Sequence, residues 1–308
     1  MIKESECKPN TIERREFVNT LALGVSGAVL GTPLFNFANT LHKSHENMTI
    51  QQVIDLINSS IPGAPFPKTV DTIKAGDASQ IVTGIVTTMF TTVEVIEKAA
   101  LLKANFIIAH EPTFYNHTDE TNWLEQDDVF RYKTALLKKH NITVWRFHDG
   151  IHAHRPDGVI TGVLNALGWE KFADPKKQYL INIKPLSLRN IIELAKEKLG
   201  ITHLRFIGNK EQLCSRIVLA PGSGGGKMQI NAISKEKPDL MICGELDEWE
   251  TSEYVRDLQL SGSKTALIVL GHIVSEEPGL EWLVNWLQPQ LPGISVTHIP
   301  SKDAFSWD

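Results

Sequence analysis

Residues 105–110 read Asn-Phe-Ile-Ile-Ala-His, an apolar run of strand length that ends in His110. Two further runs share this design: residues 143–148, Thr-Val-Trp-Arg-Phe-His, end in His148, and residues 266–272, Ala-Leu-Ile-Val-Leu-Gly-His, end in His272. In open α/β sheets, ligands bind in the crevice beyond the carboxyl ends of the strands. Three imidazoles delivered to that edge can converge on one point, and this geometry predicts a metal site.

From about residue 50 onward, apolar runs of strand length alternate with segments of helical period, which is the pattern of an α/β protein with mostly parallel sheets. The first series predicts strands at residues 80–88, 106–109 and 143–147 and helices at 93–103, 129–140 and 157–167. The second predicts strands at residues 179–183, 203–207, 216–220, 240–243, 265–270 and 294–299 and helices at 188–199, 228–235, 249–260 and 280–287. Asp157 and Ser187 stand where helix caps are expected.

The boundary between the two series falls near the Asp-Pro-Lys-Lys segment at residues 174–177. We therefore expect a first α/β lobe over residues 46–175 and a second over residues 176–308. Residues 265–308 can pack back on the first lobe and supply ligands to it.

The composition describes a globular protein with a substantial core, because 42% of the 308 residues are hydrophobic and 22% are charged. The formal net charge is -5 and the chain has no basic stripe, so nucleic acid is not an expected partner. The three cysteines, Cys7, Cys214 and Cys243, are too few and too scattered for a disulfide framework or a thiolate zinc site. Metal ligands must therefore be nitrogen and oxygen, and Cys243 is expected to be buried. A disulfide between Cys214 and Cys243 is an open alternative.

The N-terminus resembles a twin-arginine export signal. Arg14 and Arg15 precede a Gly- and Ala-rich apolar stretch at residues 21–34 that is too short for a comfortable membrane span. We expect residues 1–45 to be the signal and its linker, and the protein to be exported to the periplasm in folded form with no other membrane segment. A surface-docked amphipathic N-terminus is the alternative.

Each strand-end histidine has a second potential ligand nearby. Glu111 follows His110 directly, His152 follows His148 by four residues, and Glu276 follows His272 by four residues. Four imidazoles and two carboxylates exceed what one tetrahedral zinc needs, so they predict two divalent ions. This set of nitrogen and oxygen ligands suits zinc, iron, manganese and cobalt equally.

Each of these residues also has a structural interpretation. A strand-end histidine can be a polar residue that meets solvent, and Glu111 can be an exposed turn residue. Glu276 can complement the dipole of a helix that begins near Pro278. The metal site is favoured because three separate strand ends each carry a histidine with a second potential ligand nearby.

These segments resemble the Nif-three-like dinuclear metal family, whose members are often called GTP cyclohydrolase 1 type 2. The most specific match is residues 271–279, Gly-His-Ile-Val-Ser-Glu-Glu-Pro-Gly, and the resemblance extends over most of the chain after the signal. It implies two similar α/β lobes with the metals in the cleft between them, assembled as a homohexamer. Glu111 stands where the family usually has histidine, and His152 where it has aspartate, so one imidazole and one carboxylate have exchanged places.

Three further features lie near the predicted site. Glu245 follows the run at residues 240–243 and is a candidate general base, or else a surface carboxylate. The Gly-rich segment at residues 221–227 can cradle an anionic group at a helix start, or can be a turn that needs positive φ angles. Asp149, His154 and Asp157 flank the pair of histidines and can orient ligands.

The resulting hypothesis is an exported, metal-dependent hydrolase that uses a metal-bridging water on an unknown small substrate. The alternative is a non-catalytic metal-binding or regulatory scaffold built as an oligomer.

Overall fold

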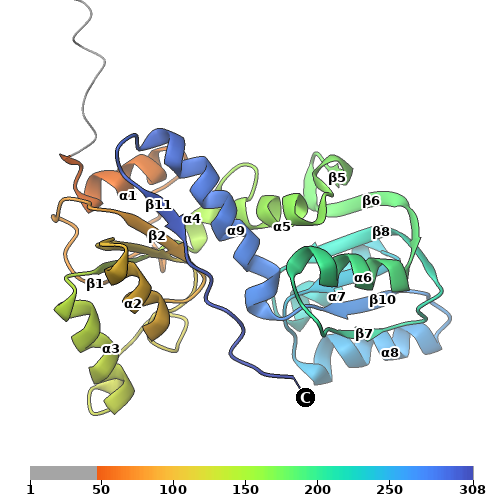
Figure 1. The fold of residues 1–308 in the computed structure, drawn as a ribbon. Helices are drawn as coiled ribbons and strands as arrows, with labels where there is room; N and C mark the ends of the chain where they lie inside the picture. Colours follow the sequence, from red (N-terminus) through yellow and green to blue (C-terminus); the bar gives the residue numbers. More distant parts are fainter. Residues whose placement is uncertain (1–46, 308) are drawn as a thin grey trace, which may run out of the picture. The chain divides into compact units, whose positions relative to one another are not determined.

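Two mixed β-sheets with flanking helices make up residues 47–307, the part of the chain that the computed structural model describes (Figure 1). The predicted export signal, its linker and Cys7 lie outside these residues. Within residues 47–307, no helix is both long and apolar enough to cross a membrane.

The first sheet has the strand order β1-β4-β3-β2-β11. Its strands are β1 (Ile73–Ala75), β2 (Ile85–Thr88), β3 (Phe106–Ala109), β4 (Thr143–Arg146) and β11 (Val296–His298). All pairs are parallel except β1 with β4, and every residue of β2, β3 and β4 is buried. Continuous apolar runs read as strands here because helices cover both faces of a parallel sheet. The predicted strand 80–88 is shorter in the structure, since residues 80–84 lead into β2 outside the ladder.

The second sheet has the strand order β5-β6-β8-β9-β10-β7. Its strands are β5 (Ala173–Asp174), β6 (Lys177–Ser187), β7 (Arg205–Ile207), β8 (Leu213–Ala220), β9 (Leu240–Cys243) and β10 (Ala266–Val269). Only β8, β9 and β10 run parallel to one another, so the expectation of a mostly parallel sheet is wrong for this half. The antiparallel strands β6 and β7 are partly exposed, and one solvated face is a property of antiparallel rather than parallel pairing.

Helices connect the strands, and α1, α2, α3, α5 and α6 begin at side-chain caps. Asp157 accepts from the Ile160 amide and Ser187 from the Asn190 amide, so both predicted caps are confirmed. The helices are α1 (Ile50–Ser59), α2 (Val93–Leu101), α3 (Asp128–Lys139), α4 (Asp149–Ala153), α5 (Gly158–Leu167), α6 (Leu188–Leu199), α7 (Gly226–Glu236), α8 (Glu253–Leu260) and α9 (His272–Leu287), with a π-helical turn at Glu248–Ser252 before α8.

Helix α9 begins eight residues before the predicted start at residue 280, because its first residue is His272 and Pro278 lies inside it. Proline removes one backbone hydrogen bond, which is why the sequence indicated a helix start there. Tight packing against α5 holds the helix together across this position. A Cβ on Gly162 would lie 2.2 Å from the Pro278 oxygen, and one on Gly279 would lie 2.7 Å from the Val159 Cα.

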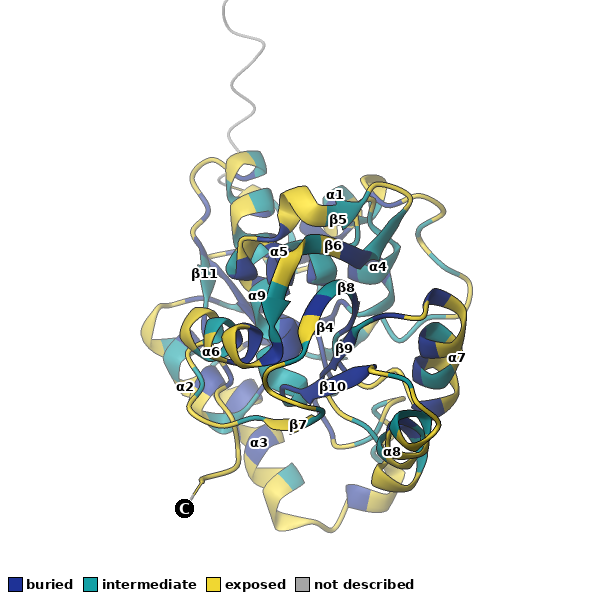
Figure 2. Ribbon diagram, turned by 90° about the vertical axis from the view of Figure 1, so that its right-hand side faces the viewer, coloured by how far each residue is buried: buried dark blue, intermediate teal, exposed yellow. Residues whose placement is uncertain are grey.

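The central strands of both sheets are buried, and Figure 2 shows β9 and β10 in the colour of buried residues. Trp145 and Phe147 stack with ring centroids 4.9 Å apart in the first core. Cys214 and Cys243 are buried and free in the second, so they form no disulfide, and burial raises the pKa of the Cys243 thiol to about 12.

Candidate metal centre

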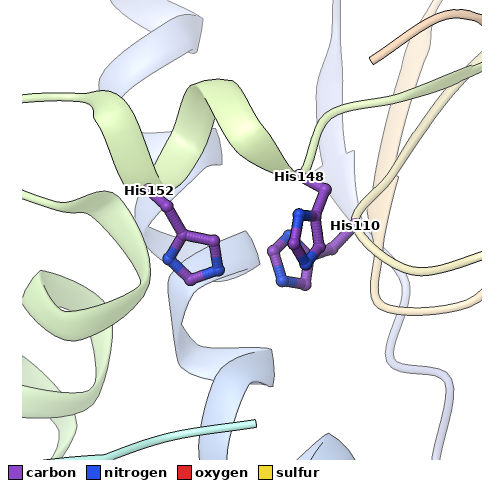
Figure 3. A group of neighbouring side chains, drawn as sticks. All are labelled: His110, His148 and His152. Atoms are coloured by element: carbon purple, nitrogen blue, oxygen red, sulfur yellow. The ribbon is translucent and has the colours of Figure 1, made fainter. Parts of the chain in front are cut away.

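The six residues predicted as ligands come together from three parts of the chain. His110 and Glu111 follow β3, His148 and His152 lie at the start and near the end of α4, and His272 begins α9. Figure 3 shows the rings of His110, His148 and His152 gathered on one side of α4. These residues include two sets, in each of which the potential ligand atoms all lie within 4.8 Å of one another. One set is His110, His148 and His152, and the other is His110, Glu111 and Glu276.

His110 belongs to both sets, and His272 lies beside the second one. Nε2 of His272 lies 3.0 Å from Oε2 of Glu276 and 3.4 Å from Oε1 of Glu111. Because α9 begins at His272, Glu276 lies one helical turn further on, on the same face of the helix. The four-residue spacing that the sequence displayed is therefore a helical spacing.

Each of the four imidazoles has its Nδ1 beside an atom that can only accept a hydrogen bond. The pairs are His110 with the Phe147 carbonyl at 3.2 Å, His148 with Asp149 Oδ1 at 3.0 Å, His152 with Asp157 Oδ2 at 3.0 Å and His272 with Glu245 Oε1 at 3.2 Å. These partners place a proton on Nδ1 and leave Nε2 as the metal-binding nitrogen, the usual arrangement around metal-ligating histidines.

The Nε2 atom of His110 fits the role of a metal ligand. It is buried and makes no hydrogen bond, although Oε2 of Glu276 lies 3.4 Å away. An unsatisfied buried polar atom is costly in a folded protein. Nitrogen and carboxylate donors around it fit a divalent cation.

The two buried carboxylates of the site are held in their ionised forms. Burial raises the pKa of Glu276, but His110 and His272 outweigh it and hold the pKa well below its ordinary value. Burial likewise opposes ionisation of Glu111, whose pKa is lowered by His272, His110 and His148. Burial lowers the pKa of His148 to about 4, so this imidazole is neutral at physiological pH.

His272 carries the opposite shift. Burial disfavours its charged form, but hydrogen bonds with Glu111 and Glu276 raise its pKa to about 10. A cation at this position therefore competes with the proton on Nε2 of His272.

Asp71 shapes the segment that carries His148 and His152, and sequence reasoning missed it. Its carboxylate accepts from the backbone amides of His148, Asp149 and Gly150 at 2.7–2.9 Å. Gly150 is needed for this close approach, because a Cβ there would lie 2.5 Å from the Phe147 ring and 3.0 Å from Asp71 Oδ2. A contact across 77 residues leaves no local sequence signal.

Two of the three residues predicted to orient ligands contact them. Asp149 and Asp157 hold His148 and His152 as described above, whereas His154 bonds the Pro156 carbonyl and lies against Trp282.

The Gly-rich segment at residues 221–227 is a close-packed turn. Gly222 has φ +65° and Gly225 has φ +74°, and a Cβ on Gly222 would lie 2.1 Å from Oε1 of Glu276. The amide of Gly226 at the start of α7 already donates to Oε2 of Glu250 at 2.9 Å. These contacts favour the turn over the anion cradle.

This chain belongs to the Duf34/NIF3 (NGG1p interacting factor 3) family, whose sequence pattern residues 44–304 match. It is 24% identical over 217 residues to a GTP cyclohydrolase 1 type 2 homolog from Clostridium acetobutylicum, covering 67% of this chain and 76% of that protein. A homolog of the same name from Clostridium perfringens is 25% identical over 243 residues, covering 74% of this chain and 86% of that protein. The fold is that of a Bacillus cereus protein related to NIF3, with a TM-score of 0.68 at 14% identity over 85% of this chain and 99% of that one.

Proposed function

We propose that this protein binds two divalent metal ions and hydrolyses a small substrate. The observation that carries the proposal is the set of four histidines with Nδ1 engaged by acceptors, clustered with two buried carboxylates. His110, His148, His152, His272, Glu111 and Glu276 are the proposed ligands. The membership of the chain in its family and the buried, unpaired Nε2 of His110 support it.

Divalent ions held here would supply Lewis acidity and would make water acidic enough to react near neutral pH. The chain itself supplies the proton acceptor. Glu245 is about half exposed and has Oε1 beside Nδ1 of His272 at 3.2 Å, which leaves Oε2 free to take a proton from a water molecule at the mouth of the site.

The proposed substrate is a small molecule with an acyl, amidine or phosphoryl bond. The two clostridial relatives are named GTP cyclohydrolase 1 type 2 homologs. We do not extend that substrate to this chain, because a protein exported by the predicted twin-arginine signal would work where free GTP is scarce. Export to the periplasm and assembly as a homohexamer are parts of the same proposal.

A non-catalytic metal-binding scaffold is the second candidate, and the burial of three of the six proposed ligands favours it. His110 is fully buried, Glu276 is 3% exposed and Glu111 is 7% exposed. A site closed on all sides by protein ligands stores or senses ions, whereas a catalytic site keeps an open position.

Metal analysis of the purified protein tests metal binding. We expect about two equivalents in the wild type and a marked loss in His272→Ala, since dinuclear sites share their ligands between two ions. His154→Ala is the matched control, because His154 lies outside the cluster and contacts Trp282 instead. Equal metal content in all three proteins would refute the assignment of His272.

Screening of the metal-loaded protein against phosphoester and cyclic-amide libraries separates the two candidates. Turnover that is lost in His272→Ala supports the hydrolase. Absence of turnover by a fully loaded protein supports the scaffold.

A further inference from the structure

Arg146 is a fully buried cation at the end of β4, directly behind the candidate metal centre. Its Nε donates to the His110 carbonyl at 3.1 Å and its Nη2 to Oε2 of Glu111 at 3.2 Å. Its Nη1 donates to the His117 carbonyl and lies 3.5 Å from Oδ2 of Asp119. All these acceptors belong to the segment that follows β3.

A buried guanidinium is tolerated only when its donors are satisfied, because an unpaired charge in the protein interior costs several kcal/mol. Here the pairing continues outward, since Lys74 Nζ lies 3.2 Å from Oδ2 of Asp119 and both side chains are almost fully buried. Glu111, Arg146, Asp119 and Lys74 form a chain of alternating charges. This series of charges begins at Glu111, a proposed metal ligand.

The two carboxylate oxygens of Glu111 have different environments. Oε2 is engaged by Arg146. Oε1 lies 3.4 Å from Nε2 of His272, 3.6 Å from Nε2 of His148 and 3.8 Å from Nε2 of His110. A carboxylate without this partner could turn either oxygen, or both, toward the imidazoles.

We propose that Arg146 is a positioning residue that occupies Oε2 of Glu111, so that Glu111 presents Oε1 alone to a bound ion. The inference rests on the proposed metal binding and specifies how one ligand of that site is oriented. A guanidinium offers only donors, so it fixes an acceptor on its own side of residue 111 whatever amide or carboxylate stands there.

Glutamine at position 111 makes this orientation measurable, because it reverses the expected effect of an Arg146 substitution on metal binding. In Glu111→Gln, Arg146 holds the amide oxygen and directs the NH₂ group, which is no metal ligand, toward the imidazoles. In Glu111→Gln/Arg146→Met the amide is free to turn its oxygen inward. Asp119 remains paired with Lys74 in both proteins.

The test is cobalt(II) titration of the full chain, followed by visible absorption of the bound ion and by equilibrium binding. We expect Arg146→Met to weaken binding of one equivalent about 10- to 100-fold, the range for residues that orient metal ligands. Glu111→Gln should weaken it by a similar factor. Adding Arg146→Met to Glu111→Gln should restore binding by about tenfold, with a change in the cobalt spectrum.

Lys74→Met is the matched control, because it removes a buried cation from the same charge chain without contact to Glu111. It should leave the cobalt spectrum unchanged. If Arg146→Met does not fold, Arg146→Lys replaces it in both backgrounds, since a single ammonium cannot keep both the Glu111 and the His110 contacts.

Two outcomes would overturn the positioning role alone. In one, the Arg146 substitution weakens cobalt binding by the same factor whether residue 111 is Glu or Gln. In the other, it weakens cobalt binding in neither background. A wild-type protein that takes up no cobalt would overturn the metal site together with the positioning role.

Discussion

The two sheets contain the same succession of strand, helix and parallel strand, but the residues at their strand ends differ. In the first sheet, β3 and β4 lead into His110, Glu111 and His148. In the second, β8, β9 and β10 lead into Gly222, Gly244 and Gly271. The first sheet places proposed ligands directly at its strand ends, whereas the second provides the space in which α9 brings His272 and Glu276 to them.

Contacts at the second sheet show why those positions carry glycine. A Cβ on Gly244 would lie 2.3 Å from the Ser275 hydroxyl, and one on Gly222 would overlap the Glu276 carboxylate. Ser275 in turn accepts from the Gly222 amide at 2.9 Å, so the turn and the helix are held against each other. The position of Glu276 in this half is thus set by backbone clearance rather than by the strand itself.

The two halves also differ in the exposure of their paired cationic side chains. Near the first sheet, Arg146, Lys133 and Lys74 are buried with their partners. In the second half, Lys177 and Arg216 are each about 40% exposed where they pair with Glu236. Buried cations support the half that carries Glu111.

Gly222→Ala should have the largest effect on this comparison, because the new Cβ would displace Glu276. We expect a loss of about 1–3 kcal/mol of folding free energy from overpacking and about 10- to 100-fold weaker metal binding, measured by thermal unfolding and by cobalt titration. Gly225→Ala is the control, because it also has positive φ but no atom within 4 Å of the new Cβ. It should cost about 1–3 kcal/mol, because φ +74° with ψ 152° is a conformation that only glycine adopts readily, and it should leave metal binding intact. Equal metal affinities in the two variants would show that clearance at Gly222 does not position Glu276.

Asp149→Asn and Glu245→Gln compare the carboxylates that orient a histidine in each half. Asp149 also accepts from Thr69 Oγ1 and the Val70 amide and is therefore fixed, whereas Glu245 is half exposed. We expect metal binding to weaken by about tenfold or more in Asp149→Asn and by less in Glu245→Gln, as measured by competition with a chelator. A larger effect of Glu245→Gln would mean that the second half controls the site more strongly than its exposure indicates.

Lys133 offers a pH test confined to the first half. Burial lowers its pKa to about 8, although Asp119 acts in the opposite direction. An unfolded lysine titrates at about pH 10.4, so the unfolded state holds the proton more tightly and stability from this group should rise between about pH 8 and 10.4. Lys133→Met should flatten that rise in melting temperature, relative to wild type and to the exposed control Lys138→Met. An unchanged pH profile would show that Lys133 is not desolvated as the structure indicates.

Much of the architecture could be predicted because buried parallel strands have uninterrupted apolar sequences. The strands at residues 106–109 and 240–243 and the helix at 188–199 have the predicted bounds. The start of α9 could not be predicted, since Pro278 is an ordinary helix-start signal and only the packing of α5 on α9 overrides it.

The amino-acid sequence by itself determined the strand ends and the histidines that follow them, because a residue just after a buried strand must emerge at the sheet edge. The four-residue spacings added His152 and Glu276, which lie in helices α4 and α9. Only the tertiary structure decided how those residues are held. Asp71, Arg146 and the glycine clearance around Glu276 act through contacts between residues far apart in the chain, and no local pattern encodes them. Orientation in this site is a property of the packed molecule, since each imidazole and carboxylate is fixed by a neighbour that folding alone brings within bonding distance.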